Sequence, residues 1–220
     1  MSRTYVIADL HGRYDLLAKA LARIEGGQTN GGTVVFLGDY IDRGPQSRQI
    51  VERLIAGPPT GWNWVTLMGN HEYLMVQCHG TPDPDWWLGN GGIHTLESYD
   101  GRVPDDHIEW AKHLPMVHRD AFRVFVHAGV DPSRALDTQG AAVLLWTRYL
   151  TKADITYPGL HIVHGHTPNR HGPELYPGRT NLDTGAVFFG RLVVGVFDDE
   201  TPGGPVALIE VTASDPPSTP

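Results

Sequence analysis

Short apolar segments alternate with amphipathic segments in the first third of the chain. Tyr5–Ala8, Thr33–Leu37 and Trp64–Met68 are rich in β-branched or aromatic residues, which predicts three buried strands. Between them, Tyr14–Ile24 and Ser47–Ile55 each place their apolar residues on one face of a helix. Strands that alternate with such helices predict an α/β fold built from βαβ units.

The pattern changes after the third predicted strand. Residues 83–115 are rich in Trp, Gly and charge and predict a helical segment with one short helix at Asp105–His113. Gly and Pro turns separate the last predicted strands, so we expect antiparallel pairing there. We predict a single domain over residues 1–212 and a flexible tail over residues 213–220. The later strand-like segments are Phe122–His127, His161–His164, Arg179–Leu182, Leu192–Phe197 and Val206–Val211.

Composition narrows the class of protein. Apolar residues make up 40% of the 220 residues, which is enough for a core, and 19% charged residues are too few for a disordered chain. A net charge of −8 argues against binding to nucleic acid polymers. The single cysteine, Cys78, allows no internal disulfide. No signal peptide or membrane span is visible in the sequence, so we expect a cytoplasmic protein without a membrane partner.

Polar side chains follow five of the predicted strands. The carboxyl ends of strands in an α/β sheet form its ligand-binding edge, so we expect these side chains to meet. Carboxylate, imidazole and amide donors without a thiolate suit Mn²⁺, Fe or Zn²⁺. The polar residues after the strands are Asp9, His11, Asp39, Asp42, Arg43, Asn70, His71, Glu72, His127 and His166.

A carboxylate such as Asp39 can bridge two cations at a spacing of about 3.5–4 Å. Two cations lower the pKa of a bridging water, and the resulting hydroxide can attack phosphorus in line. Nearby arginines can balance the charge of the phosphoryl oxygens. The residue types therefore predict a phosphoesterase with two metal ions, for which Mn²⁺ is favoured and Fe or Zn²⁺ are alternatives.

Five motifs, in this order, resemble the phosphoprotein phosphatase family of calcineurin-like metallophosphoesterases, especially its small bacterial and bacteriophage members. The resemblance covers about Tyr5 to Ala186 and implies a four-layer αββα sandwich, in which helices flank two mixed β-sheets. Ala8 stands where the family usually has Gly; the extra methyl predicts tighter packing and no lost chemistry. The motifs are Asp9-Leu-His11-Gly, Gly38-Asp39-Tyr-Ile-Asp42-Arg43-Gly44, Gly69-Asn70-His71-Glu72, His127-Ala-Gly129 and Gly165-His166-Thr167.

The resemblance also implies a role for each residue. His71 would be the general acid, and Asp42 would orient it and favour its protonated form. Arg43, and Arg148 in the segment Trp146-Thr-Arg148, would bind the phosphate, which Asn70 would also contact. The implied metal ligands are Asp9 and His11 for the first ion, Asn70, His127 and His166 for the second, and Asp39 for both.

Several residues keep more than one interpretation. Glu72 is expected to be a buried hydrogen-bonding residue rather than a catalyst. His164 could orient a ligand, approach the phosphate or, less favoured, bind metal, whereas His161 is expected on the strand surface. Trp86, Trp87 and Asn90-Gly91-Gly92 are equally consistent with a substrate-side wall and with simple packing. Asp183-Thr-Gly185 is expected to be a turn that supports the site.

The favoured function is a protein phosphatase that acts on phosphoserine and phosphothreonine, with phosphotyrosine as a further substrate. Relatives that cleave symmetrical dinucleoside tetraphosphates tend to carry Asp at the position of Glu72, so Glu72 favours a phosphoprotein or another small phosphorylated substrate. The alternative is a dinucleoside polyphosphate hydrolase, for example of diadenosine tetraphosphate, that uses the same site. A binding module that has lost catalysis is a third interpretation, but none of the expected ligands is missing.

Overall fold

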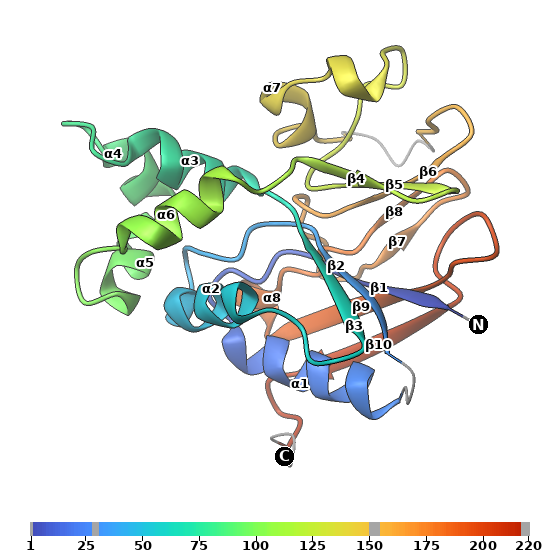
Figure 1. The fold of residues 1–220 in the computed structure, drawn as a ribbon, viewed down its shortest axis with the longest axis horizontal. Coiled ribbons are helices and arrows are strands. Elements are labelled where there is room, and N and C mark those ends of the chain that lie inside the picture. The colour runs from blue at the N-terminus through green and yellow to red at the C-terminus, as the bar shows by residue number, and fades with distance from the viewer. Residues whose placement is uncertain (1, 28–30, 150–154, 217–220) are drawn as a thin grey trace.

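The computed structural model describes residues 2–27, 31–149 and 155–216. Its first sheet has the strand order β10-β9-β1-β2-β3 (Figure 1). The three N-terminal strands are parallel, as the βαβ pattern predicts, whereas β9 pairs antiparallel with β1 and β10 pairs antiparallel with β9. The strands of this sheet are β1 (Arg3–Ile7), β2 (Gly32–Phe36), β3 (Trp62–Thr66), β9 (Arg191–Asp198) and β10 (Ala207–Thr212).

The second sheet has the order β4-β5-β6-β8-β7 and is also mixed. The expectation that all the C-terminal strands pair antiparallel is wrong for β8, which runs parallel to β6. The segment between β6 and β8 is long enough for the chain to return to the edge of the sheet at which β6 begins. Within this segment, β7 pairs antiparallel with β8. The strands are β4 (Val117–Arg119), β5 (Arg123–Val126), β6 (His161–His164), β7 (Glu174–Leu175) and β8 (Arg179–Asn181).

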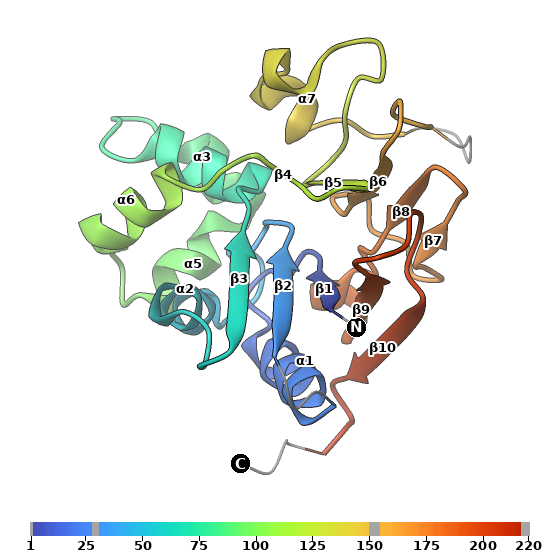
Figure 2. The same cartoon turned by 45° about the vertical axis from the view of Figure 1, so that its right-hand side comes forward.

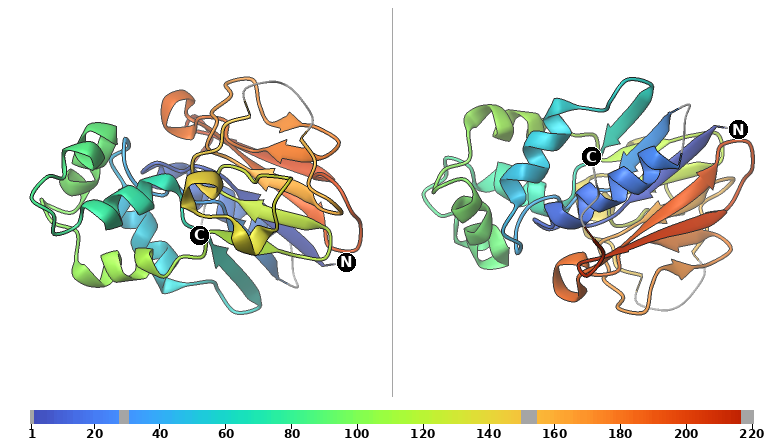
Figure 3. Two further views of the ribbon diagram at one scale, coloured as in Figure 1. Left: turned by 90° about the horizontal axis from the view of Figure 1, so that it is seen from above. Right: turned by 90° about the horizontal axis from the view of Figure 1, so that it is seen from below.

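Helices cover the first sheet on its outer side. The amphipathic helix α1 (Tyr14–Gly26) buries Leu17, Leu21 and Ile24 and lies below β1 and β2 in Figure 2. A group of helices beside β3 forms a lobe of its own, seen from above and below in Figure 3. This group consists of α2 (Ser47–Ala56), α3 (Asn70–Cys78), α4 (Asp85–Trp87), a π-helical turn (Leu88–Gly92), α5 (Ile93–Ser98) and α6 (Asp105–Lys112).

The two sheets pack face to face through a fully buried apolar layer. Val35, Phe125, Val163 and Phe197 belong to this layer, and each is completely buried. Ala8 lies in the same layer, so its methyl group adds packing there, as the sequence predicts. The outer face of the second sheet is covered by the short helix α7 (Ala141–Leu144) and by neighbouring loops. Two mixed sheets with flanking helices confirm the predicted fold class.

The C-terminal segment differs from the expected flexible tail. Asp215 accepts a hydrogen bond from Arg23 at 2.7 Å and another from the Thr212 hydroxyl at 2.8 Å. The Lys19 ammonium donates to the carbonyl of Ala213 at 3.0 Å. These bonds fasten the chain to α1 as far as residue 215, and residues 217–220 lie outside the described part. Within the described residues, no helix is long and apolar enough to cross a membrane.

Candidate metal centre

The predicted site residues converge on one cavity of about 280 Å³ at the strand ends. Eight of the ten line it: Asp9, His11, Asp39, Arg43, Asn70, His71, Arg148 and His166. The other two, Asp42 and His127, are fully buried beside it and contact lining residues. The cavity wall also contains Asn90, Trp146, Pro168, Asp183, Gly185 and Phe188. Asn90, Asp183 and Gly185 belong to segments that the sequence had placed near the site, whereas Pro168 and Phe188 had no expected role.

Backbone strain is concentrated in this site. Six non-glycine residues in the described part of the chain have a positive φ angle, and five of them are predicted site residues. Such residues occupy a sparsely populated backbone region and persist only where the surrounding structure holds them. The five are His11, Asp39, Asp42, Arg43 and His166.

Glu72 holds the loop that carries Asp39. One carboxylate oxygen accepts from the amide N–H of Asp39 at 2.9 Å and of Gly69 at 3.0 Å. The other accepts from Tyr40 at 2.8 Å and Ile41 at 3.2 Å. Burial raises the pKa of Glu72 to about 7, against the effect of these amide donors. The structure thus confirms that Glu72 is a buried hydrogen-bonding residue; its contacts are all with the backbone of the site loops.

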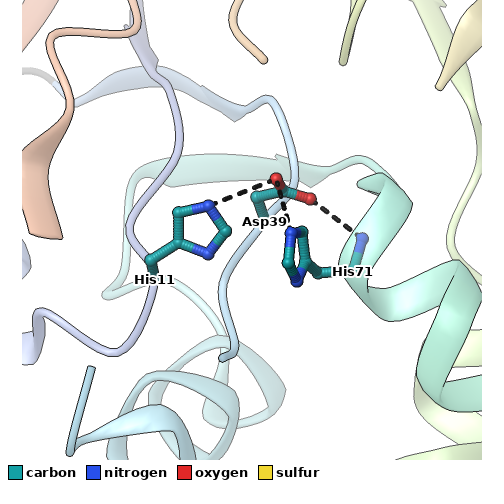
Figure 4. Close-up of side chains that lie close together, drawn as sticks. All are labelled: His11, Asp39 and His71. Carbon is teal, nitrogen blue, oxygen red and sulfur yellow. Dashed lines mark hydrogen bonds and ion pairs between the residues drawn. The ribbon is translucent and has the colours of Figure 1, made fainter. Parts of the chain in front are cut away.

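Asp39 lies between two groups of possible metal ligands. In the first group, Asp39 Oδ2 is 3.4 Å from His11 Nε2 and 4.0 Å from His71 Nε2 (Figure 4). In the second, Asp39 Oδ1 is 3.4 Å from His127 Nε2, and His166 completes the group. The ligand atoms within each group all lie within 4.8 Å of one another. The two carboxylate oxygens therefore face different groups, which is the geometry that a bridging ligand requires.

The remaining predicted ligands extend these groups. Asn70 Oδ1 lies 2.9 Å from His127 Nε2, which in turn is 3.1 Å from His166 Nδ1. The carboxylate of Asp9 accepts the amide N–H of His166 at 3.1 Å, so it ties the ends of β1 and β6 together. The structure thus brings together all six predicted ligands, and their roles as ligands remain predictions.

The electrostatics of the site fit two divalent cations. Burial lowers the pKa of His11 and His127 well below the usual value, and that of His166 to about 3, so these imidazoles are neutral as metal ligands must be. Burial raises the pKa of Asp9 and Asp39 well above the usual value; repulsion from Asp183 adds to this for Asp9, and repulsion from Asp9 and Glu72 adds to it for Asp39. Buried carboxylates at such short range require a compensating positive charge, and bound cations supply one.

Two arginines reach the two groups from the cavity side. Arg43 Nη1 lies 2.5 Å from Nε2 of His11, and Arg148 Nε lies 3.4 Å from Nε2 of His166. Each guanidinium thus contacts an imidazole nitrogen that is a predicted metal ligand. One predicted phosphate-binding arginine thus lies at each of the two ligand groups. A phosphoryl group bound between the two ligand groups would meet one arginine on each side.

His71 and Asp42 form the pair that the sequence predicts. His71 Nδ1 is 2.7 Å from Asp42 Oδ2, and both side chains are buried. Burial lowers the pKa of His71, while the hydrogen bond to Asp42 opposes that change. Asp42 thus acts on the pKa of His71 in the predicted direction, and the protonated imidazole remains a prediction.

Two neighbouring histidines on β6 had uncertain roles in the sequence, and one of them, His161, differs in position from the expectation. His161 is buried rather than on the surface, and its Nε2 lies 2.9 Å from the Thr180 hydroxyl on the adjacent strand. His164 contacts the Gly165 carbonyl at 3.0 Å and Arg179 at 3.2 Å, behind the metal groups. Of the interpretations left open for His164, these contacts agree with a residue that orients the ligand loop.

The profile of the calcineurin-like phosphoesterases matches residues 2–195 of the chain. The chain belongs to the calcineurin-like phosphoesterases. This phosphoesterase is therefore a hydrolase of a family that binds two divalent metal ions, and the buried Asp and His groups of the site could hold them. The identity of the metal is open, since several divalent ions share these donors.

Its relatives carry two different names. A symmetrical bis(5'-nucleosyl)-tetraphosphatase of Paracidovorax citrulli is 31% identical over 78% of this chain and 59% of its own length. Serine/threonine-protein phosphatase 1 of Salmonella typhimurium is 29% identical over 86% of this chain and 89% of its own length. The phosphoesterase thus spans little more than half of the first relative and most of the second.

Among solved structures, a protein serine/threonine phosphatase from Saccharomyces cerevisiae, described as similar to human phosphatase PP5, superposes with a TM-score of 0.66. The match covers 98% of this chain and 81% of the yeast chain at 18% identity. This likeness establishes the shared fold.

Proposed function

We propose that this phosphoesterase hydrolyses phosphate monoesters and acts as a protein phosphatase on phosphoserine and phosphothreonine. The observation that carries the proposal is the convergence of Arg43, Arg148 and His71 on one cavity with the two metal groups. Two bound cations would activate a water nucleophile and polarise the phosphoryl oxygens. The protein side chains would then position the phosphoryl group and deliver a proton to the departing oxygen.

Each side chain has a defined task in this proposal. Arg43 and Arg148 bind the phosphoryl oxygens from the two sides, with Asn70 as a further hydrogen-bond donor. His71 donates its proton to the leaving oxygen, which is the step that limits hydrolysis of an alkyl phosphate such as phosphoserine. Asp42 fixes the orientation of the imidazole by accepting a hydrogen bond at Nδ1.

Two observations support a phosphoprotein as the substrate. The alignment with the Salmonella protein phosphatase extends over nearly the full length of that relative, whereas the nucleotide hydrolase is matched over 59%. Glu72 spans four backbone amides of the site loops, and the shorter side chain of Asp would not reach both pairs in the same way.

Dinucleoside polyphosphates are the second candidate class, and the aromatic rim of the cavity favours them. The exposed ring of Trp86 stacks on Trp146 with an interplanar angle of 8°, and Trp146 lines the cavity. Phe188, which is 57% exposed, lines it as well. Such rings can stack on nucleobases. The same rings can also contact the phenyl group of phosphotyrosine.

A side-by-side assay separates the two classes. The purified protein, loaded with Mn²⁺, would be given a phosphoserine peptide and a dinucleoside tetraphosphate, with the Asp39→Asn variant as the blank. We expect the peptide to be turned over faster by wild type than by the variant. A thousandfold preference for the nucleotide, or peptide turnover no greater than that of the variant, contradicts the proposal.

Substitution of Phe188 should change recognition of aromatic substrates. The Arg43 guanidinium lies over the Phe188 ring, 5.7 Å from its centroid, so the ring both flanks the cavity and contacts a phosphate-binding residue. For Phe188→Ala we expect KM for a phosphotyrosine peptide to rise about 3- to 10-fold, the value of one aromatic contact. KM for a phosphoserine peptide should change less, and equal changes for both peptides would contradict a role in contacting the leaving group.

A further inference from the structure

Asp42 is held by more than its histidine partner. Its carboxylate is fully buried and accepts the indole N–H of Trp87, at 3.1 Å to Oδ1 and 3.0 Å to Oδ2. The Thr95 hydroxyl donates to Oδ1 at 2.6 Å. Trp87 is the last residue of α4 and Thr95 lies in α5, so both partners are far from Asp42 in sequence. With these bonds, the side chain has donors on both oxygens and little freedom to rotate away from His71.

The same segment holds the backbone of the site loop. The amide N–H of Asp42 donates to the hydroxyl oxygens of Thr95 at 2.9 Å and Ser47 at 3.1 Å. The amide of Arg43 donates to the carbonyl of Gly91 at 3.2 Å. Asp42 and Arg43 have φ angles of 73° and 69°, a strained region that external contacts must maintain. The hydrogen bonds from the segment supply these contacts.

Two glycines make this close approach possible. A methyl group on Gly91 would lie 2.8 Å from Cγ of Arg43 and 3.0 Å from its backbone nitrogen. Gly91 also has a φ angle of 110°, which other residues rarely adopt. A methyl group on Gly92 would lie 2.6 Å from the indole ring of Trp87. The Asn90-Gly91-Gly92 turn therefore packs its backbone directly against both Arg43 and Trp87.

We propose that residues 87–95 form a brace that positions Asp42, and through it His71, for proton transfer, with Trp87 and Thr95 as its positioning residues. This inference rests on the proposed function, in which His71 is the general acid. The brace also fixes the backbone from which Arg43 reaches the phosphate. The brace assigns a role to Trp87 and to the Asn90-Gly91-Gly92 turn. From the sequence alone, these residues are equally consistent with a substrate-side wall and with simple packing.

The brace orients Asp42 and takes no direct part in the proton transfer. Neither Trp87 nor Thr95 lines the cavity, so neither contacts the substrate. If the indole N–H is removed, Asp42 keeps fewer donors and can turn Oδ2 away from Nδ1 of His71. The imidazole then loses the bond that fixes its ring orientation and its tautomer. Proton delivery should suffer, whereas the carbonyl of Gly91 still accepts the amide N–H of Arg43, so phosphate binding and metal binding should not.

Trp87→Phe tests the brace because it keeps an aromatic ring in the core and removes only the N–H and part of the ring. We expect kcat for phenyl phosphate to fall about 10-fold or more, a part of the full general-acid effect. With 2,4-dinitrophenyl phosphate, whose leaving group needs little protonation, the loss should be at most twofold or so. KM and bound metal should match the wild type.

Trp64→Phe is the matched control. Its buried indole N–H has no hydrogen-bond partner within the described residues, and it lies on β3 outside the cavity. The substitution removes the same group from another buried site, so it reports the effect of altered packing alone. We expect its ratio of rates on the two aryl phosphates to equal that of the wild type.

Thr95 provides the second pair of variants. Thr95→Val removes the hydroxyl that both donates to Oδ1 and accepts from the Asp42 amide, and we expect the same selective loss on phenyl phosphate. Thr95→Ser keeps the hydroxyl and should restore the wild-type ratio. Equal losses on both aryl phosphates, lost metal, or no rescue by serine would overturn the brace.

The outcome also separates the brace from the proposed function. If His71→Asn shows the leaving-group dependence and Trp87→Phe does not, the brace is wrong and the general acid stands. If the wild-type protein hydrolyses neither aryl phosphate, the proposed monoesterase activity itself is wrong. A selective loss in Trp87→Phe and Thr95→Val, absent from Trp64→Phe, supports both.

Discussion

Asp39→Asn should abolish most of the activity of the phosphoesterase. Asp39 places one carboxylate oxygen near His11 and the other near His127, so the substitution weakens both metal groups at once. A neutral amide is a poorer partner for a divalent cation than a carboxylate. Because metal ions contribute several kcal/mol to the stabilisation of the transition state, we expect kcat/KM to fall on the order of 10³-fold or more. Metal analysis after Mn²⁺ loading should show fewer bound equivalents.

The same variant should be more stable than wild type when chelator is present. Burial, Asp9 and Glu72 all raise the pKa of Asp39 in the folded protein, whereas the unfolded chain keeps the ordinary value. A carboxyl with a raised folded pKa loses stability as pH rises from the unfolded value through the folded value. The advantage of Asp39→Asn in melting temperature should therefore grow as pH rises above the ordinary carboxyl pKa and should shrink under acidic conditions.

An exposed carboxylate supplies the control for both measurements. Asp106 lies in the first turn of α6, far from the cavity, and Asp106→Asn should leave kcat/KM, metal content and the pH dependence of melting unchanged. If Asp39→Asn retained two equivalents of metal and near wild-type turnover, the bridging role would be wrong. If Asp39→Asn melted at a lower temperature than wild type with chelator present, the argument that the buried Asp39 carboxylate destabilises the metal-free protein would be wrong.

The convergence of the candidate metal ligands could be predicted because it depends on local sequence signals. Each ligand follows a short apolar strand, and parallel strands end at one edge of a sheet, so the position of Asp9, Asp39 and Asn70 follows from the order of the elements. The helix limits were also close: α1 spans Tyr14–Gly26 where Tyr14–Ile24 was expected. In these segments the spacing of apolar residues and the packing of the folded protein agree.

The segment between the third and fourth strands could not be predicted in the same way. Its last helix, α6, spans Asp105–Lys112, where Asp105–His113 was predicted. The elements between α3 and α6 include a π-helical turn over Leu88–Gly92 and are too short to give a clear apolar period. The hydrogen bond between Trp87 and Asp42 joins residues that are 45 positions apart, so no local sequence pattern predicts it. The parallel pairing of β8 and the burial of His161 likewise depend on which strand becomes the neighbour, which turn residues do not determine.

His71→Asn should separate the general acid from the metal ligands. His71 shares the group in Figure 4 with His11 and Asp39, so its position alone is compatible with either role. Its Nδ1 is occupied by Asp42 at 2.7 Å, while Nε2 faces the cavity at 4.0 Å from Asp39. A nitrogen that faces the substrate, on a ring oriented by a buried carboxylate, suits proton donation. We therefore expect metal content to remain at the wild-type level.

Turnover of a phosphoserine peptide by His71→Asn should fall about 10²–10⁴-fold, the usual loss when general acid catalysis is removed. The loss should be smaller for p-nitrophenyl phosphate, because nitrophenolate departs with little help from a proton. His113→Asn, at an exposed helix end, is the control and should behave as wild type on both substrates. Loss of metal from His71→Asn would instead make His71 a ligand. The first ion would then be held by the group His11, Asp39 and His71, and proton delivery would have to come from another residue of the cavity.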